Sequence, residues 1–121
     1  MDDMILLSKL ESLKHCLERI QSKMPISKEA LHTDWDLQDI MTLNLQRAVQ
    51  TCVDIAAHLV AELSLPTPMN MAESFARLEQ AEVIRATTSE RMKKSVGFRN
   101  VTVHAYETML QRRWDIGATR F

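Results

Sequence analysis

Hydrophobic residues recur at helical spacing along most of the chain, and this pattern predicts long helices joined by short connectors. The first predicted helix spans residues 2–24. Its apolar residues stand at every third or fourth position and form one narrow stripe: Leu6, Leu10, Leu13, Leu17, Ile20 and Met24. Pro25 cannot continue a helix, because it lacks a backbone N–H. Residues 25–33 are therefore predicted to form a loop.

The second predicted helix begins near Thr33 or Asp34 and meets no glycine or proline before Pro66. It can therefore run for roughly 28 residues, or about 40 Å. Asp34, Asp36 and Asp39 lie near its positive N-terminal end, where acidic residues are favourable. Apolar residues occupy more than one face of this helix, so it must be covered on two sides. In so short a chain, the second cover is expected to come from another subunit.

Two further helices are predicted beyond the connector that contains Pro66 and Pro68. Residues 70–73 have the spacing of a capping box, which opens a short helix through about residue 80 and buries Phe75 and Leu78. The last well-defined helix is predicted to begin near residues 88–89.

The last predicted helix contains a weak stretch and ends in an irregular tail. Residues 101–103 read Val-Thr-Val, and β-branched residues are weak helix formers, so a local distortion is expected there. The apolar pattern dissolves after Met109, and the tail is predicted to break at Gly117. The complete pattern predicts an all-α bundle of up-and-down helices.

Composition is typical of one globular domain covering residues 1–121. Apolar residues make up 45% of the chain and charged residues 26%, with two glycines and three prolines, which argues against a disordered or turn-rich β protein. Two cysteines cannot form a disulfide framework or a four-cysteine zinc site, and the histidines lack metal-ligand spacing, so neither metal nor cofactor is expected. The sequence shows no signal peptide, and its apolar stretches are shorter than the ~18 residues of a membrane span. A cytoplasmic protein without a membrane partner is expected.

Charge is distributed unevenly along the chain. Residues 1–84 carry 7 Lys or Arg against 13 Asp or Glu, whereas residues 85–121 carry 8 against 3. A basic C-terminal part can attract phosphate groups, while an acidic body discourages indiscriminate nucleic-acid binding. A solvated helix face with unequal charge would give the same pattern.

Four polar residues stand close together in the last predicted helix: Arg99, Asn100, His104 and Tyr106, within the sequence FRNVTVHAY. On a regular helix Asn100 and His104 share one face, and Arg99 and Tyr106 share another. Arg99 and His104 point roughly 140° apart at 100° per residue. Both can therefore act on one phosphate only if the helix deforms or if two copies of the motif meet across an interface.

Such residues can catalyse RNA cleavage without a metal ion. The RNA 2′-hydroxyl attacks the adjacent phosphate, which requires a base for its proton and an acid for the leaving 5′-oxygen. His104 suits either role because histidine titrates near neutral pH. Arg99 stays charged and can stabilise the phosphoryl oxygens. A purely structural interpretation is also open, in which the arginine pairs with a carboxylate and the histidine caps a helix end.

Three stretches resemble the HepT-like branch of the HEPN domain family: LQDIMTLNLQRAVQTCVDIAAHLVAE, ESFARLEQAEVI and MKKSVGFRNVTVHAY. The resemblance implies an all-helical HEPN bundle that forms a two-fold homodimer. It also implies a metal-independent endoribonuclease that cleaves RNA, with no DNA substrate expected. By the same resemblance, Arg99 and His104 map onto the catalytic arginine and histidine, and Asn100 onto the supporting polar residue after the arginine.

The family resemblance further implies a bacterial type VII toxin–antitoxin system. Its antitoxin is an MntA-type minimal nucleotidyltransferase, which adenylylates the tyrosine that corresponds to Tyr106. The main alternative is a non-catalytic HEPN module that only associates with a nucleotidyltransferase. The family usually continues with a further helix, which WDI at residues 114–116 would begin, but GATRF follows here. A truncated C-terminal helix after residue 116, and hence an inert remnant, is a third reading.

Overall fold

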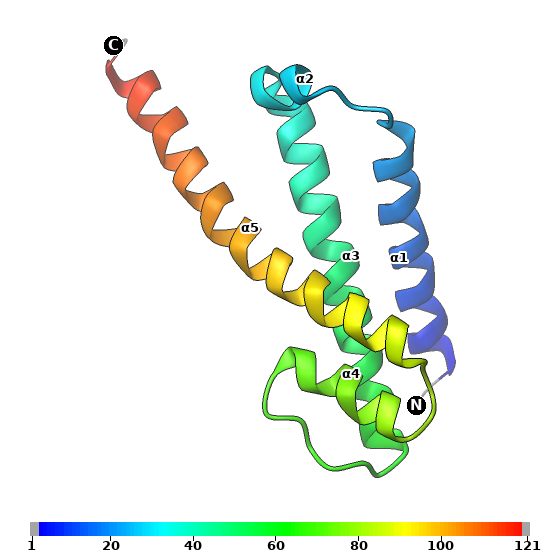
Figure 1. The fold of residues 1–121 in the computed structure, drawn as a ribbon. Coiled ribbons are helices and arrows are strands. Elements are labelled where there is room, and N and C mark those ends of the chain that lie inside the picture. The colour runs from blue at the N-terminus through cyan, green and yellow to red at the C-terminus, as the bar shows by residue number, and fades with distance from the viewer. Residues whose placement is uncertain (1–2, 120–121) are drawn as a thin grey trace.

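The protein is an up-and-down bundle of helices in a computed structural model, which describes residues 3–119 (Figure 1). The described residues form five helices and no strand: α1 (Asp3–Ser22), α2 (Lys28–Thr33), α3 (Trp35–Glu62), α4 (Met71–Gln80) and α5 (Ala86–Thr119). The predicted all-α fold is confirmed. None of these helices is long and apolar enough to cross a membrane.

The long helix α3 is the centre of the bundle. Helix α1 packs along one side of it, whereas α4 and the first half of α5 cover another side; α1 and α5 make no packing contact within the described residues (Figure 1). Much of the two-sided cover predicted for α3 therefore comes from the same chain, and the cover expected from a second subunit stays a prediction. Apolar surface remains exposed mainly on α1 and α5.

The core lies at the end of the bundle where α4 meets α3. Phe75 and Leu78 of α4 are buried against Val53, Ala56 and Val60 of α3 and Val96 of α5. Burial of Phe75 and Leu78 was expected from their spacing and is confirmed. At the other end α5 diverges from α3, as Figure 1 shows.

The buried stripe of α1 differs from the predicted one. Cys16 is only 4% exposed, whereas Leu10 and Leu17 are 44% and 45% exposed. The interior side of α1 follows residues 6, 9, 13, 16 and 20, which includes Lys9, whose ammonium group pairs with Asp54 of α3 at 3.5 Å. A lysine can line an inner face when its head group meets a carboxylate. Helix α1 is therefore rotated about its axis relative to the predicted orientation, and the spacing of its apolar residues alone could not show this.

Local capping explains where the shorter helices begin. The predicted loop over residues 25–33 instead contains α2, because the Ser27 side chain accepts a hydrogen bond from the Ala30 N–H and caps the turn. Asp34 then caps α3 by accepting from the Leu37 N–H, as the sequence predicts. A serine N-cap beyond a proline was the signal for this extra helix.

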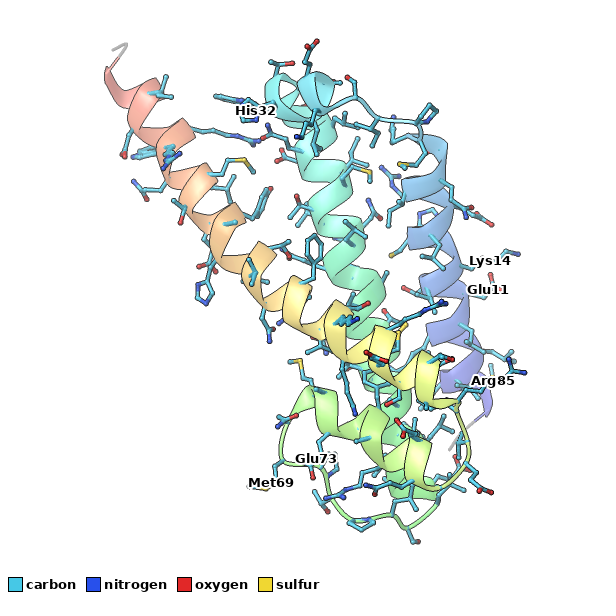
Figure 2. The ribbon with its side chains drawn as sticks, in the orientation of Figure 1. Glu11, Lys14, His32, Met69, Glu73 and Arg85 are labelled. Atoms are coloured by element: carbon cyan, nitrogen blue, oxygen red, sulfur yellow. The ribbon has the colours of Figure 1, made fainter. Side chains whose placement is uncertain are left out.

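The predicted capping box at the start of α4 is present in an extended form. The Asn70 side chain accepts from the Glu73 N–H at 2.9 Å, and the Glu73 carboxylate accepts from the Met69 N–H at 3.2 Å. Figure 2 shows Met69 and Glu73 together at the loop that enters α4. In the usual capping box this carboxylate accepts from the N–H of the N-cap residue. Here Glu73 accepts instead from Met69, the residue before the N-cap Asn70.

Helix α5 is longer and more regular than its sequence predicts. It begins at Ala86, continues through the Val-Thr-Val stretch without interruption and extends past Gly117 to Thr119. The predicted distortion and break are therefore wrong, as is the new helix at residues 114–116, which belong to α5. Contacts stabilise this end: Gln111 donates to Asp115 one turn away, and Arg113 binds α3. Residues 120–121, at the end of the predicted tail, lie outside the described part of the chain.

Candidate active site on helix α5

Helix α5 carries the candidate residues on different sides. Arg99 and Tyr106 are half-buried on the side that faces α3, whereas His104 and Asn100 are exposed. Because α5 is continuous through this region, Arg99 and His104 keep their separation of roughly 140° around the axis. One chain therefore does not bring this arginine and histidine together.

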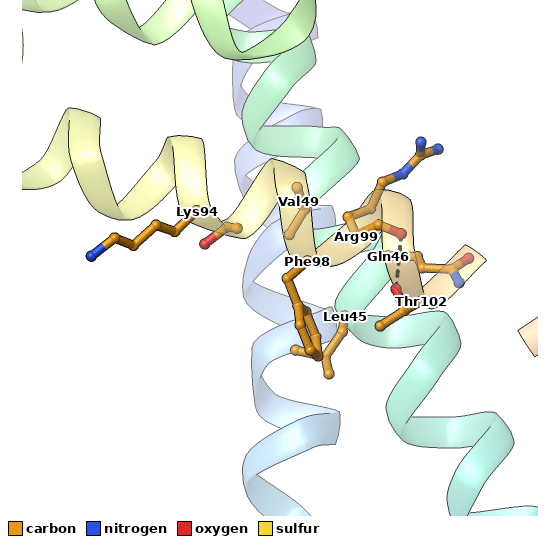
Figure 3. Close-up of a pocket in the computed structure, with 8 residues that line it drawn as sticks. Leu45, Gln46, Val49, Lys94, Phe98, Arg99 and Thr102 are labelled. Carbon is orange, nitrogen blue, oxygen red and sulfur yellow. Dashed lines mark hydrogen bonds between the residues drawn. The ribbon is translucent and has the colours of Figure 1, made fainter. Parts of the chain in front are cut away.

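Arg99 lines a pocket of about 270 Å³ between α3 and α5. The pocket is lined by Leu45, Gln46, Val49, Lys94, Ser95, Phe98, Arg99 and Thr102. In Figure 3 the side chain of Phe98 lies beside Leu45, while the Arg99 guanidinium extends in another direction. The pocket thus combines an apolar floor with a cationic edge.

The Arg99 guanidinium is only partly satisfied by the protein. One terminal nitrogen donates to the neighbouring Asn100 Oδ1 at 3.2 Å. Among the described residues, nothing accepts a hydrogen bond from the buried Arg99 Nε. An arginine with unused donors beside a pocket is suited to bind a phosphate group. Asn100 thus holds one terminal nitrogen of Arg99, and its supporting role stays a prediction.

Tyr106 belongs to a polar cluster that joins α5 to α3. Its hydroxyl donates to Asp39 Oδ1 at 3.1 Å. Arg113 donates to the same oxygen at 2.9 Å and to Gln38 Oε1 at 2.7 Å, and its guanidinium lies 4.6 Å from the centre of the Trp35 ring. We call Trp35, Gln38, Asp39, Tyr106 and Arg113 the tyrosine cluster.

Of this cluster, sequence reasoning singled out only Tyr106 as a site residue and missed the other four members. It assigned Asp39 only to the N-terminal end of α3 and placed Arg113 in a tail without pattern. A signal was present, because Arg99, Tyr106 and Arg113 follow one another at intervals of seven residues and share one stripe of a helix. The pairing with Asp39 could not be found this way, since it joins residues 74 positions apart.

The cluster also raises the pKa of the Tyr106 phenol. Its partial burial, its hydrogen bond to Asp39 and the negative charge of that carboxylate all raise the pKa of Tyr106 above the ordinary 10.0. The positive charge of Arg113 opposes this increase in the pKa. The Tyr106 hydroxyl is thus a neutral nucleophile, and its proton is already hydrogen-bonded to the Asp39 carboxylate.

An up-and-down helical bundle whose last long helix carries an Arg-x4-His motif defines a HEPN-type protein. The family model for ribonuclease HepT-like proteins matches residues 13–115 of this chain. The chain therefore belongs to the HepT-like ribonuclease family.

A known nuclease shares sequence with this chain, and solved structures share its fold as well. The mRNA nuclease HepT of Shewanella oneidensis is 36% identical over 105 residues, which cover 87% of this chain and 78% of that protein. The tri-AMPylated S. oneidensis HEPN toxin, in complex with an MNT antitoxin, superposes with a TM-score of 0.79 at 38% identity, over 88% of this chain and 78% of the toxin. One chain of a toxin–antitoxin complex with AMP-PNP gives a TM-score of 0.76 at 37% identity, over 83% of this chain and 75% of that chain.

Proposed function

We propose that the protein is the endoribonuclease toxin of a toxin–antitoxin pair, with a nucleotidyltransferase as its antitoxin. The observation that carries this proposal is the identity of 36% to an mRNA nuclease over 87% of the chain. The arrangement of α5 supports it, because the helix offers an exposed histidine and an arginine with unused donors.

The proposed reaction is metal-independent cleavage of RNA by its own 2′-hydroxyl. The 2′-oxygen forms a bond to phosphorus while the bond from phosphorus to the 5′-oxygen breaks, which leaves a 2′,3′-cyclic phosphate and a free 5′-hydroxyl. His104 moves a proton in this step, and Arg99 stabilises the charge on the phosphoryl oxygens. Asn100 orients Arg99 through the hydrogen bond described above.

A two-fold dimer would complete the site, because one step needs both an acid and a base and each chain offers one His104. The exposed apolar residues are suited to such an interface: Met4, Ile5, Leu7, Leu10 and Leu17 on α1, and Phe98, Val101, Leu110, Trp114 and Ile116 on α5. Light scattering at micromolar concentration is expected to give twice the mass of one chain. A stable folded monomer under those conditions would contradict the dimer.

Cleavage is expected to continue in excess EDTA and to leave 2′,3′-cyclic phosphate ends, because protein side chains alone carry the proton transfers. The purified dimer and a labelled RNA are sufficient, with product ends identified by mass spectrometry. A requirement for added Mg²⁺ would disprove metal independence. If the folded dimer cleaves no RNA and inhibits no growth but still binds the nucleotidyltransferase, the protein is the non-catalytic binding module instead.

Silencing is proposed to act through Tyr106. The solved S. oneidensis toxin is tri-AMPylated, and Tyr106 is the only tyrosine of this chain. Tyr106 lies roughly 10 Å along the helix axis from Arg99, on the same stripe. An attached AMP therefore brings a negative charge within reach of Arg99, which would pair with the adduct instead of RNA.

A further inference from the structure

The hydroxyl group of Tyr106 already has a proton acceptor within its own chain. Its O–H donates to Asp39 Oδ1 at 3.1 Å, across the gap between α5 and α3. The Asp39 side chain is 35% exposed, so the carboxylate is accessible from solvent while bound to the tyrosine. A neutral phenol attacks phosphorus poorly unless its proton is removed as the new bond forms.

A cation is fixed beside the same hydroxyl. Arg113 donates to the same oxygen of Asp39 at 2.9 Å, which makes its guanidinium a neighbour of the Tyr106 hydroxyl. Gln38 and the face of Trp35 hold the guanidinium from α3, and the side chain is only 12% exposed. Among the described residues, the Arg113 Nε has no hydrogen-bond partner; because this atom is buried, its donor reaches a phosphoryl oxygen only when the side chain moves away from Asp39.

We propose that Asp39 and Arg113 activate Tyr106 for adenylylation, Asp39 as the proton acceptor and Arg113 as the cation that receives the incoming phosphoryl group. This inference rests on the proposed function, in which Tyr106 is the residue modified. The toxin thereby supplies part of the machinery for its own silencing.

The proposed step requires one co-reactant, a nucleoside triphosphate. The Tyr106 oxygen forms a bond to the α-phosphorus of ATP, and the bond from that phosphorus to the bridging oxygen breaks. Pyrophosphate leaves with the bonding electron pair. The phenolic proton passes to the Asp39 carboxylate and then to solvent. Arg113, released from Asp39 as that group becomes neutral, can pair with the new phosphodiester.

The first test concerns the contact itself and requires no partner. Because the chain has one tyrosine, phenolate absorbance as a function of pH reports Tyr106 alone. Asp39→Asn should lower the pKa of Tyr106 by removing the negative charge beside it, and Arg113→Met should raise it. Asp36→Asn and Arg112→Met remove the same charges from exposed neighbouring positions and should leave the titration unchanged.

The second test measures the rate of AMP addition with the nucleotidyltransferase and ATP, followed by mass spectrometry. Asp39→Asn keeps an oxygen for the tyrosine and Arg113 but cannot take a proton, so we expect a loss of about 10²-fold near neutral pH. The loss should shrink as pH rises, because hydroxide then removes the proton. The ratio of variant to parent rate cancels titrations within the partner enzyme. Asp36→Asn should match the parent throughout.

The outcomes separate this inference from the proposed function. If the parent is modified on Tyr106 and both Asp39→Asn and Arg113→Met react equally fast, with the same pH profile, the roles of Asp39 and Arg113 are overturned while adenylylation stands. A rate loss that is constant with pH would indicate a purely structural contact and would also overturn them. Asp39→Glu, which retains a carboxylate, should keep the pH profile of the parent even where Asp39→Asn folds poorly. Absence of any modification in the parent would overturn both proposals.

Discussion

Replacing His104 with alanine is expected to reduce RNA cleavage by about 10²–10⁴-fold, the usual contribution of a positioned acid or base. The side chain is exposed on α5, so its loss leaves no cavity in the core. Helix content and the free energy of unfolding should therefore stay close to those of the parent. Circular dichroism and a quantitative cleavage assay on the same preparation measure both quantities.

The matched control for this prediction is His15→Ala, which removes another exposed histidine, from α1. Helix α1 does not pack on α5 within the described residues, so this variant should cleave at the rate of the parent. Equal losses in both variants would point to a general effect of histidine removal. Full activity of the alanine variant at position 104 would show that His104 does not transfer a proton.

Replacing Tyr106 with phenylalanine is expected to abolish silencing of the toxin by its nucleotidyltransferase. The ring remains, but the oxygen that accepts the nucleotide is gone. The structural cost should be modest, about 1 kcal/mol for one hydrogen bond, because Asp39 keeps its contact with Arg113. Cells that express both the variant and the nucleotidyltransferase should stop growing, and mass spectrometry should find no AMP on the variant.

The interpretation of that experiment depends on binding. The phenylalanine variant should still form a complex with the nucleotidyltransferase, measured by size-exclusion chromatography. If the partner silences the variant as well as it silences the parent, inhibition acts by occlusion and Tyr106 has another role. Loss of complex formation would instead make Tyr106 part of the binding surface.

The sequence predicted most of the helices, and physical reasons account for the differences. Helical periodicity and caps located α3 and α4, because Asp34 and Asn70 act through neighbours only three residues away. Helix α2 was missed because it is only six residues long and buries no side chain, so the Ser27 cap, not an apolar repeat, defines it. The end of α5 was missed because a contact with α3, not an apolar repeat, stabilises it.

The candidate site was predictable only in part. The motif and its family resemblance gave Arg99, Asn100, His104 and Tyr106, and helical geometry placed the arginine and histidine on different sides, which the continuous α5 retains. The link between Tyr106 and Asp39 joins residues 67 positions apart, so no local spacing could indicate it. The rotation of α1 that exposes Leu10 and Leu17 likewise depends on packing between helices.

The central claim is that RNA is cleaved by its own 2′-hydroxyl, and one substrate pair tests it most directly. The parent protein is incubated in EDTA with an RNA whose preferred cleavage position is known, and with the same RNA carrying a single 2′-deoxy nucleotide there. We predict rapid cleavage of the first RNA with a 2′,3′-cyclic phosphate end, and no cleavage at the deoxy position of the second. Equal cleavage of both substrates would contradict the mechanism.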